Sequence, residues 1–387
     1  MRNIILYDVA EVRDNLLPMT YTRPVAELRL GIDTIREKWE RMFPGEYSYK
    51  VSAEYLAPKF PIKEADTLDD YYIASHVCPS PELVNAVETL PRGCRICVSG
   101  EEIARHGKEA KETMEIDTEV TALRSLPDIF MLNGAVLASD FEALTAGRRS
   151  QPLSDTVTVI GDPSKVFLEE GAWVEAAVLN VQNGPIYIGR NSEVMEGTLV
   201  RGPLALCNDS HINMGTKVYG ATTIGPWCKV GGELSNVVMI GYSNKAHDGF
   251  LGNAVIGEWC NLGADCVASN LKNDYTEIKL WNYPAHRFLR TGLQFCGLIM
   301  ADHSKAGINT MFNTATVVGV GCNIHGSGFP RNFVASFSEG GAAGFSDVAM
   351  SKFFDIARRA MARRHVDLTQ TDIDIFEAVR EIAETYK

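Results

Sequence analysis

A six-residue period of aliphatic side chains runs through the middle of the chain. Eight positions spaced by six are all Ile, Leu or Val: Ile188, Val194, Val200, Leu206, Ile212, Val218, Ile224 and Val230. This period matches neither the 3.6 residues of an α-helical turn nor the two-residue alternation of a lone strand, so it predicts a parallel β-helix in which each hexapeptide forms one side of a triangular coil. Glycine follows the inward residue at Gly189 and Gly225, where we expect a tight corner.

The same period recurs in three further blocks, and its phase changes between them. The blocks are Ile160, Val166, Ala172 and Val178; Phe250, Ile256, Leu262 and Ala268; and Met300, Ala306, Phe312, Val318 and Ile324. The phase changes predict inserted loops at residues 231–249 and 269–299. Because function in repeat proteins gathers where insertions share one face, we expect these two loops to carry the functional site.

The chain before the repeat has a different pattern. Residues 1–150 lack the six-residue period and alternate short apolar runs with helical patterns at Val25 to Trp39 and Pro81 to Leu90. Such alternation predicts an α/β layer domain. The solenoid is expected to span residues 151–345.

Residues 346–387 are expected to form a helical extension. Ser346 is a candidate N-cap for a helix reaching about Arg364, and Thr371 for a second helix reaching Tyr386. We expect this extension to cap the open end of the solenoid, whose last coil would otherwise expose a sheet edge.

Composition limits the class of protein and its partners. The chain has 387 residues, 45% of them hydrophobic and 22% charged, which is typical of a globular protein with two or three domains. Its net charge of -12 repels phosphate backbones and acidic lipid head groups, so neither nucleic acid nor a membrane is expected as the main partner. Nine Cys at irregular spacings, without a signal segment, predict a cytoplasmic protein with reduced thiols. We interpret the single CxxC, Cys94 to Cys97, as buried packing rather than a zinc site.

A motif near the N-terminus carries a first resemblance. Residues 17–25, Leu-Pro-Met-Thr-Tyr-Thr-Arg-Pro-Val, resemble the signature L-x-P-[LM]-T-x-x-R-P-K of sugar-1-phosphate nucleotidyltransferases. In that family a preceding glycine-rich turn cradles the nucleotide phosphates, and the Lys neutralises charge as pyrophosphate leaves. Here residues 8–13 contain no glycine and Val25 stands at the Lys position. These departures predict that nucleotidyl transfer is lost. Arg13 and Arg23 are candidate phosphate contacts and Asp8 a candidate Mg²⁺ ligand, with ordinary structural roles as the alternatives.

A second motif carries a more specific resemblance. Residues 245–257, Lys-Ala-His-Asp-Gly-Phe-Leu-Gly-Asn-Ala-Val-Ile-Gly, are followed by Asn-Leu-Gly-Ala at 261–264 and Ser-Asn at 269–270. They resemble the acetyltransferase half of the bifunctional N-acetylglucosamine-1-phosphate uridylyltransferase/glucosamine-1-phosphate N-acetyltransferase family. That family also places an α/β nucleotidyltransferase domain before a left-handed β-helix and a C-terminal extension. The chain is identified as a divergent member, with the strongest local matching over about residues 220–275.

The resemblance assigns roles to individual residues. His247 falls on the family's catalytic base, which takes a proton from the acceptor as it attacks an acetyl thioester. Asn270 falls on an Asn of the acetyl and acceptor pocket, where an amide can orient the amine or the developing oxyanion. Phe250 replaces a Tyr that contacts sugar phosphate. Lys229 and Lys245 are candidates for the family's sugar-phosphate Lys.

Two further groups are candidates for the site. His303 begins the last hexad block after the second predicted insertion and is a secondary catalytic candidate. Four arginines, Arg358, Arg359, Arg363 and Arg364, cluster on the predicted tail helix. They form either a solvated helix face or a clamp for the 3'-phosphate of coenzyme A or for a nucleotide.

The sequence thus predicts a transferase: an acyltransferase that uses acetyl-CoA, or another acyl-CoA, on a sugar phosphate or nucleotide sugar. Flat prism faces with apolar residues predict a homotrimer. Mg²⁺ is required only if the N-terminal domain is active. Two alternatives stay open. One is a non-catalytic trimer that binds or senses a nucleotide sugar, and the other is a working sugar-1-phosphate nucleotidyltransferase with a replaced phosphate loop.

Overall fold

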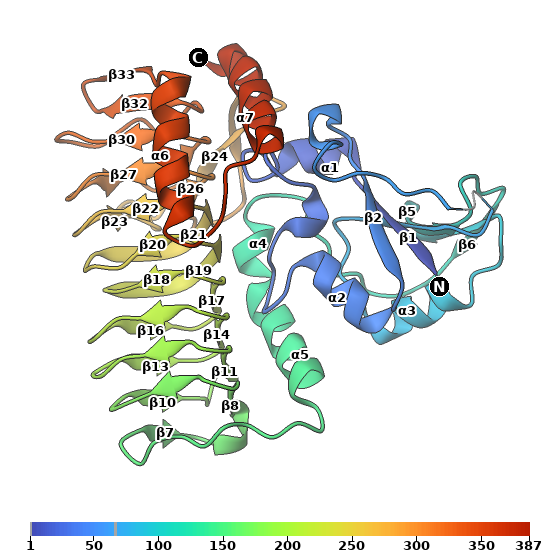
Figure 1. The fold of residues 1–387 in the computed structure, drawn as a ribbon, viewed down its shortest axis with the longest axis horizontal. Coiled ribbons are helices and arrows are strands. Elements are labelled where there is room, and N and C mark those ends of the chain that lie inside the picture. Colours follow the sequence, from blue (N-terminus) through green and yellow to red (C-terminus); the bar gives the residue numbers. More distant parts are fainter. Residues whose placement is uncertain (1, 66–67) are drawn as a thin grey trace. The chain divides into compact units, whose positions relative to one another are not determined.

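The computed structural model describes residues 2–65 and 68–387, which form two compact units (Figure 1). The first unit comprises Met1–Leu28 and Asp33–Asp128, and the second comprises Arg29–Ile32 and Ile129–Lys387. The helices that immediately precede residue 150 therefore group with the solenoid. Among the described helices, none combines the length and the apolar character that crossing a bilayer requires.

The first unit is built on a six-stranded sheet of order β2-β1-β3-β5-β4-β6. Its strands are β1 (Asn3–Tyr7), β2 (Glu46–Lys50), β3 (Tyr71–Ala74), β4 (Cys94–Val98), β5 (Glu101–His106) and β6 (Glu112–Glu115). Strand β1 pairs in parallel with both β2 and β3, whereas β5 runs antiparallel to β3 and β4. Helices α1 (Ala10–Asn15), α2 (Ile35–Met42) and α3 (Pro81–Glu88) and the 3₁₀ turns η1 (Val25–Glu27) and η2 (Glu54–Leu56) connect the strands. Parallel neighbours joined through helices confirm the predicted α/β class.

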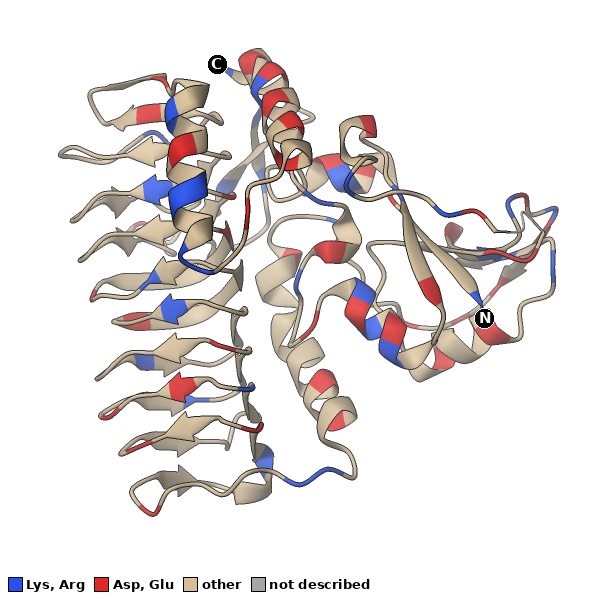
Figure 2. Ribbon diagram, viewed as in Figure 1, with Lys and Arg blue, Asp and Glu red and all other residues tan. Residues whose placement is uncertain are grey.

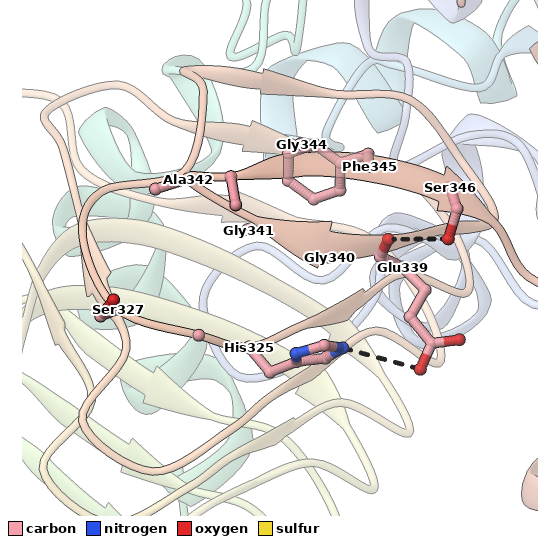
Figure 3. A pocket seen from close by; sticks show the side chains of 11 residues that line it. His325, Ser327, Glu339, Gly340, Gly341, Ala342, Gly344, Phe345 and Ser346 are labelled. Carbon is pink, nitrogen blue, oxygen red and sulfur yellow. Dashed lines mark hydrogen bonds and ion pairs between the residues drawn. The ribbon is translucent and has the colours of Figure 1, made fainter.

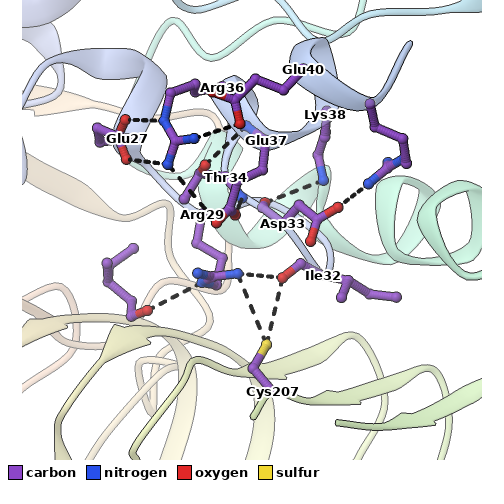
Figure 4. A network of polar contacts seen from close by, with 12 residues as sticks. Glu27, Arg29, Ile32, Asp33, Thr34, Arg36, Glu37, Lys38, Glu40 and Cys207 are labelled. Atoms are coloured by element: carbon purple, nitrogen blue, oxygen red, sulfur yellow. Dashed lines mark hydrogen bonds and ion pairs between the residues drawn. The ribbon is translucent and has the colours of Figure 1, made fainter. Parts of the chain in front are cut away.

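The helix predicted from Val25 to Trp39 is wrong in its first half. Only the 3₁₀ turn η1 forms there, because Gly31 adopts a left-handed φ of +73° before α2 begins. Thr34 caps α2 reciprocally: its hydroxyl accepts from the Glu37 N–H, and the Glu37 carboxylate accepts from the Thr34 N–H (Figure 4). This capping box is a sequence signal for the true helix start. The helix predicted at Pro81 is confirmed as α3, with Ser80 as its N-cap.

The second unit is dominated by a left-handed parallel β-helix with three faces, as predicted (Figure 1). The first face is a ten-stranded sheet: β9 (Trp173–Val174), β12 (Glu193–Val194), β15 (His211–Ile212), β18 (Lys229–Val230), β20 (Asn244–Lys245), β22 (Asn261–Leu262), β27 (Lys305–Ala306), β30 (Asn323–Ile324), β32 (Ser338–Gly341) and β33 (Gly344–Asp347). The second face holds β7 (Thr158–Ile160), β10 (Val178–Asn180), β13 (Leu199–Arg201), β16 (Lys217–Tyr219), β23 (Val267–Ala268) and β28 (Met311–Phe312).

The third face completes each coil. It holds β8 (Val166–Leu168), β11 (Ile186–Ile188), β14 (Leu204–Leu206), β17 (Thr222–Ile224), β26 (Ile299–Met300), β29 (Val317–Val318) and β31 (Phe333–Val334). The long strands β19 (Glu233–Gly241) and β21 (Phe250–Glu258) run through the second and third faces, and the 3₁₀ turn η3 (Pro163–Lys165) precedes β8.

The central hexad register is confirmed. All eight Ile, Leu and Val positions from 188 to 230 point into the prism and are at most 2% exposed. The inward positions of the last block, from Met300 to Ile324, are at most 4% exposed. In the second block Leu251, which pairs with the buried Leu234, points inward in place of Phe250.

The first predicted block is wrong in phase at Ile160 and Val178, whereas its Val166 is buried in the core as predicted. Ile160 is 40% exposed, and Val178 pairs with the exposed Leu199 on the outer side of the second face. Leu179 is the residue that pairs with the inward Val200. Because side chains alternate along a strand, this displacement by one residue exchanges the inner and outer sets.

Gly189 and Gly225 serve inter-coil packing rather than a special corner conformation. Neither has a positive φ. A Cβ on Gly225 would lie 2.1 Å from the Ile240 carbonyl oxygen, and one on Gly189 would lie 2.7 Å from the Asn208 nitrogen. The backbone of the next coil therefore excludes any side chain at these positions.

The segment 231–249 is not an inserted loop. It contains β19 and β20, which continue the coil. Val230 pairs with Lys245, 15 positions further on, whereas Ile212 pairs with Val230, 18 positions further on. The phase changes here because one coil is shorter. The segment 269–299 is a true insertion, confirmed by the antiparallel hairpin of β24 (Lys279–Asn282) and β25 (Arg287–Arg290).

The C-terminal extension is helical, with corrected starts. Helix α6 (Met350–Ala362) begins after Ala349, since Ser346 lies in β33. Helix α7 (Gln370–Ala383) is capped by Thr369 rather than Thr371 and continues into η4 (Glu384–Tyr386). The helices pack beside the last coils, with Phe353 of α6 at 5.1 Å from the Phe337 ring. The edge of β32 is covered by the antiparallel β33, so the helices do not cap that edge as predicted.

Two earlier segments also pack on the solenoid. Helix α5 (Asn133–Thr145) follows α4 (Asp128–Met131), and its Leu137 and Phe141 contact Phe167 and Tyr187 on the outer side of the third face. In the short segment Arg29–Ile32, the Arg29 guanidinium donates to the Ile32 carbonyl beside Cys207 (Figure 4).

Candidate functional site

The turn at residues 246–249 joins β20 on the first face to β21 on the second. It is wedged between two coils: a Cβ on Gly231 would lie 2.4 Å from the Ala246 carbonyl oxygen, and one on Gly249 would lie 2.1 Å from the Cys266 carbonyl oxygen. The side chains of His247 and Asp248 are exposed. The turn therefore has a tightly packed backbone and presents an imidazole to the outside.

Lys245 lies directly beneath this turn, inside the prism. It pairs with Val230 at an inward position and is only 1% exposed. Its Nζ donates to the carbonyl oxygens of Gly231 at 3.1 Å, His247 at 2.6 Å and Asp248 at 3.2 Å. Burial lowers the pKa of Lys245 to about 8. The ammonium group thus faces backbone oxygens.

Phe250 directly follows this turn, and Asn270, which follows β23, lies beside it. A Cβ on Gly252 would lie 2.6 Å from both the Asn270 Nδ2 and the Phe250 Cζ. The Asn270 Nδ2 donates to the Asn253 Oδ1 at 2.8 Å, which fixes the orientation of the amide. Both Phe250 and Asn270 are partly buried. Lys229, on β18 of the first face, pairs with Asn244, the neighbour of Lys245.

His303 lies at a different corner of the prism. It precedes β27 of the first face, whereas His247 follows β20, so the two residues stand at opposite edges of that face. The His303 ring is 5% exposed and is stacked 6.0 Å from Trp259. The rings of Phe353 and Phe376 meet it edge-on at 5.7 and 5.2 Å. His303 is therefore enclosed by aromatic side chains.

Arg358 and Arg359 lie in α6, which carries several basic residues (Figure 2), and Arg363 and Arg364 directly follow its last residue. Arg358, Arg359 and Arg363 are exposed, and Arg364 is partly buried. The Arg358 Nη1 lies 3.4 Å from the Asp355 carboxylate. The opposite side of α6 is the one that packs on the coils, through residues such as Phe353.

In the first unit, Asp8 follows β1 and is held by the chain itself. Its Oδ1 accepts from the Val25 N–H at 3.1 Å and from the Ser75 hydroxyl at 2.7 Å, and burial raises the pKa of Asp8. Helix α1 occupies residues 10–15, where the resemblance implies a glycine-rich turn. Within residues 2–65 and 68–387, no three His, Cys, Asp or Glu side chains gather as a metal site would require.

The predicted phosphate-binding arginines of this unit are buried. The Arg13 Nη2 donates to the Tyr55 hydroxyl at 2.6 Å and to the Thr20 carbonyl at 3.3 Å. Arg23 is 5% exposed. Cys94 and Cys97, the CxxC pair on β4, are also buried.

A separate pocket of about 710 Å³ lies at the last coil (Figure 3). It is lined by His325, Ser327 and the glycine-rich hairpin of β32 and β33. The His325 Nε2 lies 3.6 Å from the Glu339 carboxylate, which also pairs with Lys352 at 2.8 Å. None of the site residues predicted from the sequence lines this pocket.

Comparisons with known proteins support the interpretation of the chain as a nucleotidyltransferase-like domain followed by a solenoid. The model of the sugar nucleotidyl transferase family matches residues 4–149. Three curated relatives are each named Bifunctional protein GlmU. The relative from Synechococcus elongatus is 23% identical over 206 residues, which cover 47% of this chain and 41% of the relative. That from Cyanothece is 26% identical over 155 residues (35% and 34%), and that from Methanocaldococcus jannaschii is 30% identical over 95 residues (24% and 22%).

Residues 4–149 match the sugar nucleotidyl transferase family, and the chain is similar to the GlmU proteins over part of its length. It spans less than half the length of each of these curated relatives. A solved structure, UDP-N-acetylglucosamine O-acyltransferase (LpxA) from Moraxella catarrhalis, matches over 60% of this chain and 91% of that chain, with 12% identity and a TM-score of 0.23. At this TM-score the match adds nothing to the strand pairing, which by itself establishes the solenoid.

Three residues of this GlmU-like chain make contacts that the sequence did not predict. Asn253 accepts a hydrogen bond from Asn270. The one feature of the sequence that points to Asn253 is its position directly after Leu251-Gly252 in the second motif. Lys245 is an inward residue, which only the coil register reveals. In the first unit, the His76 Nε2 meets the Glu101 carboxylate at 2.9 Å, and Arg124 holds the other oxygen at 2.7 Å. Burial lowers the pKa of His76, so its ring is neutral near pH 7 and donates to Glu101.

Proposed function

We propose that this GlmU-like protein transfers an acyl group from an acyl-CoA, with acetyl-CoA as the expected donor, to a sugar phosphate or a nucleotide sugar. The observation that carries the proposal is the exposed imidazole of His247 on a tightly packed turn. The proposal is also supported by the Asn270 amide, which is oriented by Asn253 of β21, the strand that follows this turn.

In this proposal His247 is the general base. Its neutral imidazole takes a proton from the acceptor amine or hydroxyl as that group attacks the thioester carbonyl carbon. A new C–N or C–O bond forms, the C–S bond breaks, and the proton held by His247 passes to the departing coenzyme A thiolate. Asn270 supplies an N–H donor for the developing oxyanion or a carbonyl that orients the acceptor.

The contacts to the acceptor depart from those that the resemblance implies. Phe250 has no hydroxyl, and the Lys245 ammonium is occupied by three carbonyl oxygens inside the prism. The remaining solenoid candidate for the phosphate group is Lys229, one coil earlier. An acceptor other than glucosamine 1-phosphate follows from these changes. The exposed Arg358, Arg359 and Arg363 are the candidates for the 3'-phosphate of coenzyme A.

A homotrimer is part of the proposal. On the second face Ile160, Leu199 and Tyr219 are all at least 40% exposed and line a groove of about 470 Å³. Arg201 and Lys217 line the same groove beside these apolar side chains. The exposed apolar residues favour association between copies of the chain, for which we infer a closed threefold arrangement. The proposal also places the protein in the cytoplasm, in keeping with nine Cys that are all buried.

A second candidate function is a trimer that binds a nucleotide sugar without catalysis. The observation that favours it is in the first unit. There the family match covers residues 4–149, yet Asp8 and Arg13 are bonded within the chain. Such a unit can keep a ligand-binding role after losing nucleotidyl transfer.

One assay separates the two functions. The full chain is incubated with acetyl-CoA and a panel of amino sugars, sugar 1-phosphates and nucleotide sugars, and release of free thiol is followed. Acceptor-dependent thiol release supports the acyltransferase. Thermal stabilisation by a nucleotide sugar, without thiol release with any acceptor, supports the binding protein.

A further inference from the structure

Lys245 occupies an inward position of the solenoid, where an apolar side chain is expected. The inward residue of the preceding coil at this place is Val230, and the core cluster of the prism is formed by apolar side chains. Placing an ammonium group there is costly unless its hydrogens are all bonded. A residue of similar length without a donor, such as Met, would fill the same space at a lower cost. Packing therefore gives no reason for a lysine.

The three acceptors show what the lysine adds. Two of them, the carbonyls of His247 and Asp248, belong to the turn that follows, and the third, of Gly231, belongs to the preceding coil. Three N–H bonds of one ammonium group match three carbonyl oxygens. The side chain thus ties the middle of the turn to the coil behind it from the inside.

A second lysine of the solenoid, Lys305, is partly buried and lies elsewhere. Lys305 donates to the carbonyls of Trp259 and His303, at the opposite edge of the first face. Burial lowers its pKa to about 8, as it does for Lys245. Lys305 therefore provides a comparison residue with the same chemistry and no bond to the turn at 246–249.

We propose that Lys245 is a positioning residue for His247. From inside the prism, its three hydrogen bonds hold residues 247 and 248 against the preceding coil, so that the imidazole projects in one direction. The inference rests on the proposed function, in which His247 is the base. It extends that function by assigning Lys245 to the backbone of the site instead of to the sugar phosphate.

Amide hydrogen exchange tests the positioning role without any need for activity. Three backbone N–H groups donate to carbonyls of this segment: Gly231 to Lys245 at 2.7 Å, Glu233 to Gly249 at 3.0 Å and Asp265 to Asp248 at 3.1 Å. In the full-length Lys245→Met variant we expect these amides to exchange at least about tenfold faster, because local opening requires less free energy once the turn is released. The Lys305→Met variant should leave all three amides at the wild-type rate.

The transfer assay gives a second readout. In Lys245→Met we expect kcat to fall by roughly 10- to 100-fold, the order expected when a reacting group is misplaced, while KM for acetyl-CoA is unchanged. If Lys245→Met does not fold, Lys245→Gln keeps two N–H donors and should show a smaller increase in exchange at the same amides.

The outcomes separate the two proposals. Wild-type exchange at Gly231, Glu233 and Asp265 in a folded Lys245 variant would overturn the positioning role. A large loss of activity with unchanged exchange would also overturn it, because the lysine would then act on substrate. Faster exchange in a protein that transfers no acyl group would keep Lys245 as the residue that fixes the turn and would remove the acyltransferase proposal.

Discussion

Lys245 and His247 stand two positions apart in the chain and have opposite environments. The lysine is buried and bonded to carbonyl oxygens, and the histidine is exposed at the corner between two faces. An imidazole that accepts and releases protons during turnover needs access to substrate, whereas a group that fixes a backbone works best away from water. The short turn separates these two requirements.

We expect His247→Ala to slow acyl transfer by roughly 10²- to 10⁴-fold, the usual contribution of a general base. Affinity for acetyl-CoA should change little, since the imidazole acts on the acceptor. Thiol release at saturating acetyl-CoA measures the effect. The matched control is His325→Ala, since His325 also follows a strand of the first face but lies at the last coil, beside Glu339.

Wild-type turnover in His247→Ala would end the assignment of the base, and a comparable loss in His325→Ala would show that the effect is not local. Asn270→Ala serves as a graded comparison. It should cost less than His247→Ala, because one donor to an oxyanion contributes at most about 2 to 4 kcal/mol and a backbone N–H can share the task.

The candidate site could be predicted in part. The motif at residues 245–257 predicted His247 and Phe250 as site residues, and the Ser-Asn pair at 269–270 predicted Asn270. It could not give the direction of Lys245, because a six-residue period assigns inward positions only while its phase holds, and the phase changes in this coil. Burial of Arg13 depends on Tyr55, a partner 42 positions away. A local sequence pattern cannot predict a contact between residues so far apart in the chain.

Among the structural elements, the coil is held by close contacts between backbones. Gly225 has an ordinary φ, yet a Cβ there would lie 2.1 Å from the Ile240 carbonyl oxygen of the next coil. Gly215 is the reverse case: its φ is +71°, and nothing lies within 4 Å of its Cβ position. The two glycines thus separate a packing requirement from a conformational one.

We therefore expect Gly225→Ala to lower the free energy of unfolding by about 3 kcal/mol, the upper part of the usual range for an overpacked site. Gly215→Ala should cost only about 1 kcal/mol, the strain of a left-handed alanine. Urea unfolding followed by circular dichroism measures both variants under the same conditions. Equal losses would contradict the inter-coil explanation, as would a fully stable Gly225→Ala protein.

The period predicted the elements well and their boundaries less well. Eight inward residues in one register leave little freedom, so the prism was predictable. The change of phase after Val230 was interpreted as an insertion, but a coil that is three residues short shifts a six-residue period in the same way as one that is three residues long. In the first coil, Val178 and Leu179 are both apolar, and only pairing with β13 decides which of them points inward.

For the whole molecule, we expect a trimer because apolar side chains are exposed on the second face of the solenoid. Leu199 is 51% exposed at its centre. Light scattering at micromolar concentration should give about three times the 42.5 kDa chain mass. Leu199→Asp should lower that mass, because a carboxylate is costly in a closed apolar interface. Met114→Asp, at an exposed position on β6 of the first unit, should not. A monomeric wild-type protein would remove the trimer.

The two units of the molecule are expected to differ in activity. In the first, the N–H of Val25 is donated to Asp8, α1 replaces a glycine-rich turn, and Arg13 is bonded to Tyr55. Nucleotidyl transfer needs free backbone N–H groups and a cation at the leaving pyrophosphate. In this region the Val25 N–H is bonded to Asp8 and the Arg13 guanidinium to Tyr55, so these two groups are already occupied within the chain.

We therefore expect no detectable pyrophosphate release when the full chain is given a nucleoside triphosphate, a sugar 1-phosphate and Mg²⁺. Val25→Lys should not restore it, because the substitution supplies a cation but leaves α1 and the backbone bond from residue 25 to Asp8 in place. A coupled pyrophosphate assay with several nucleotide and sugar combinations makes the measurement, and acyl transfer by the same preparation serves as the control for folded protein. Robust pyrophosphate release by the wild type would show that a replaced phosphate site works. The sugar nucleotidyltransferase would then be the favoured function of this chain.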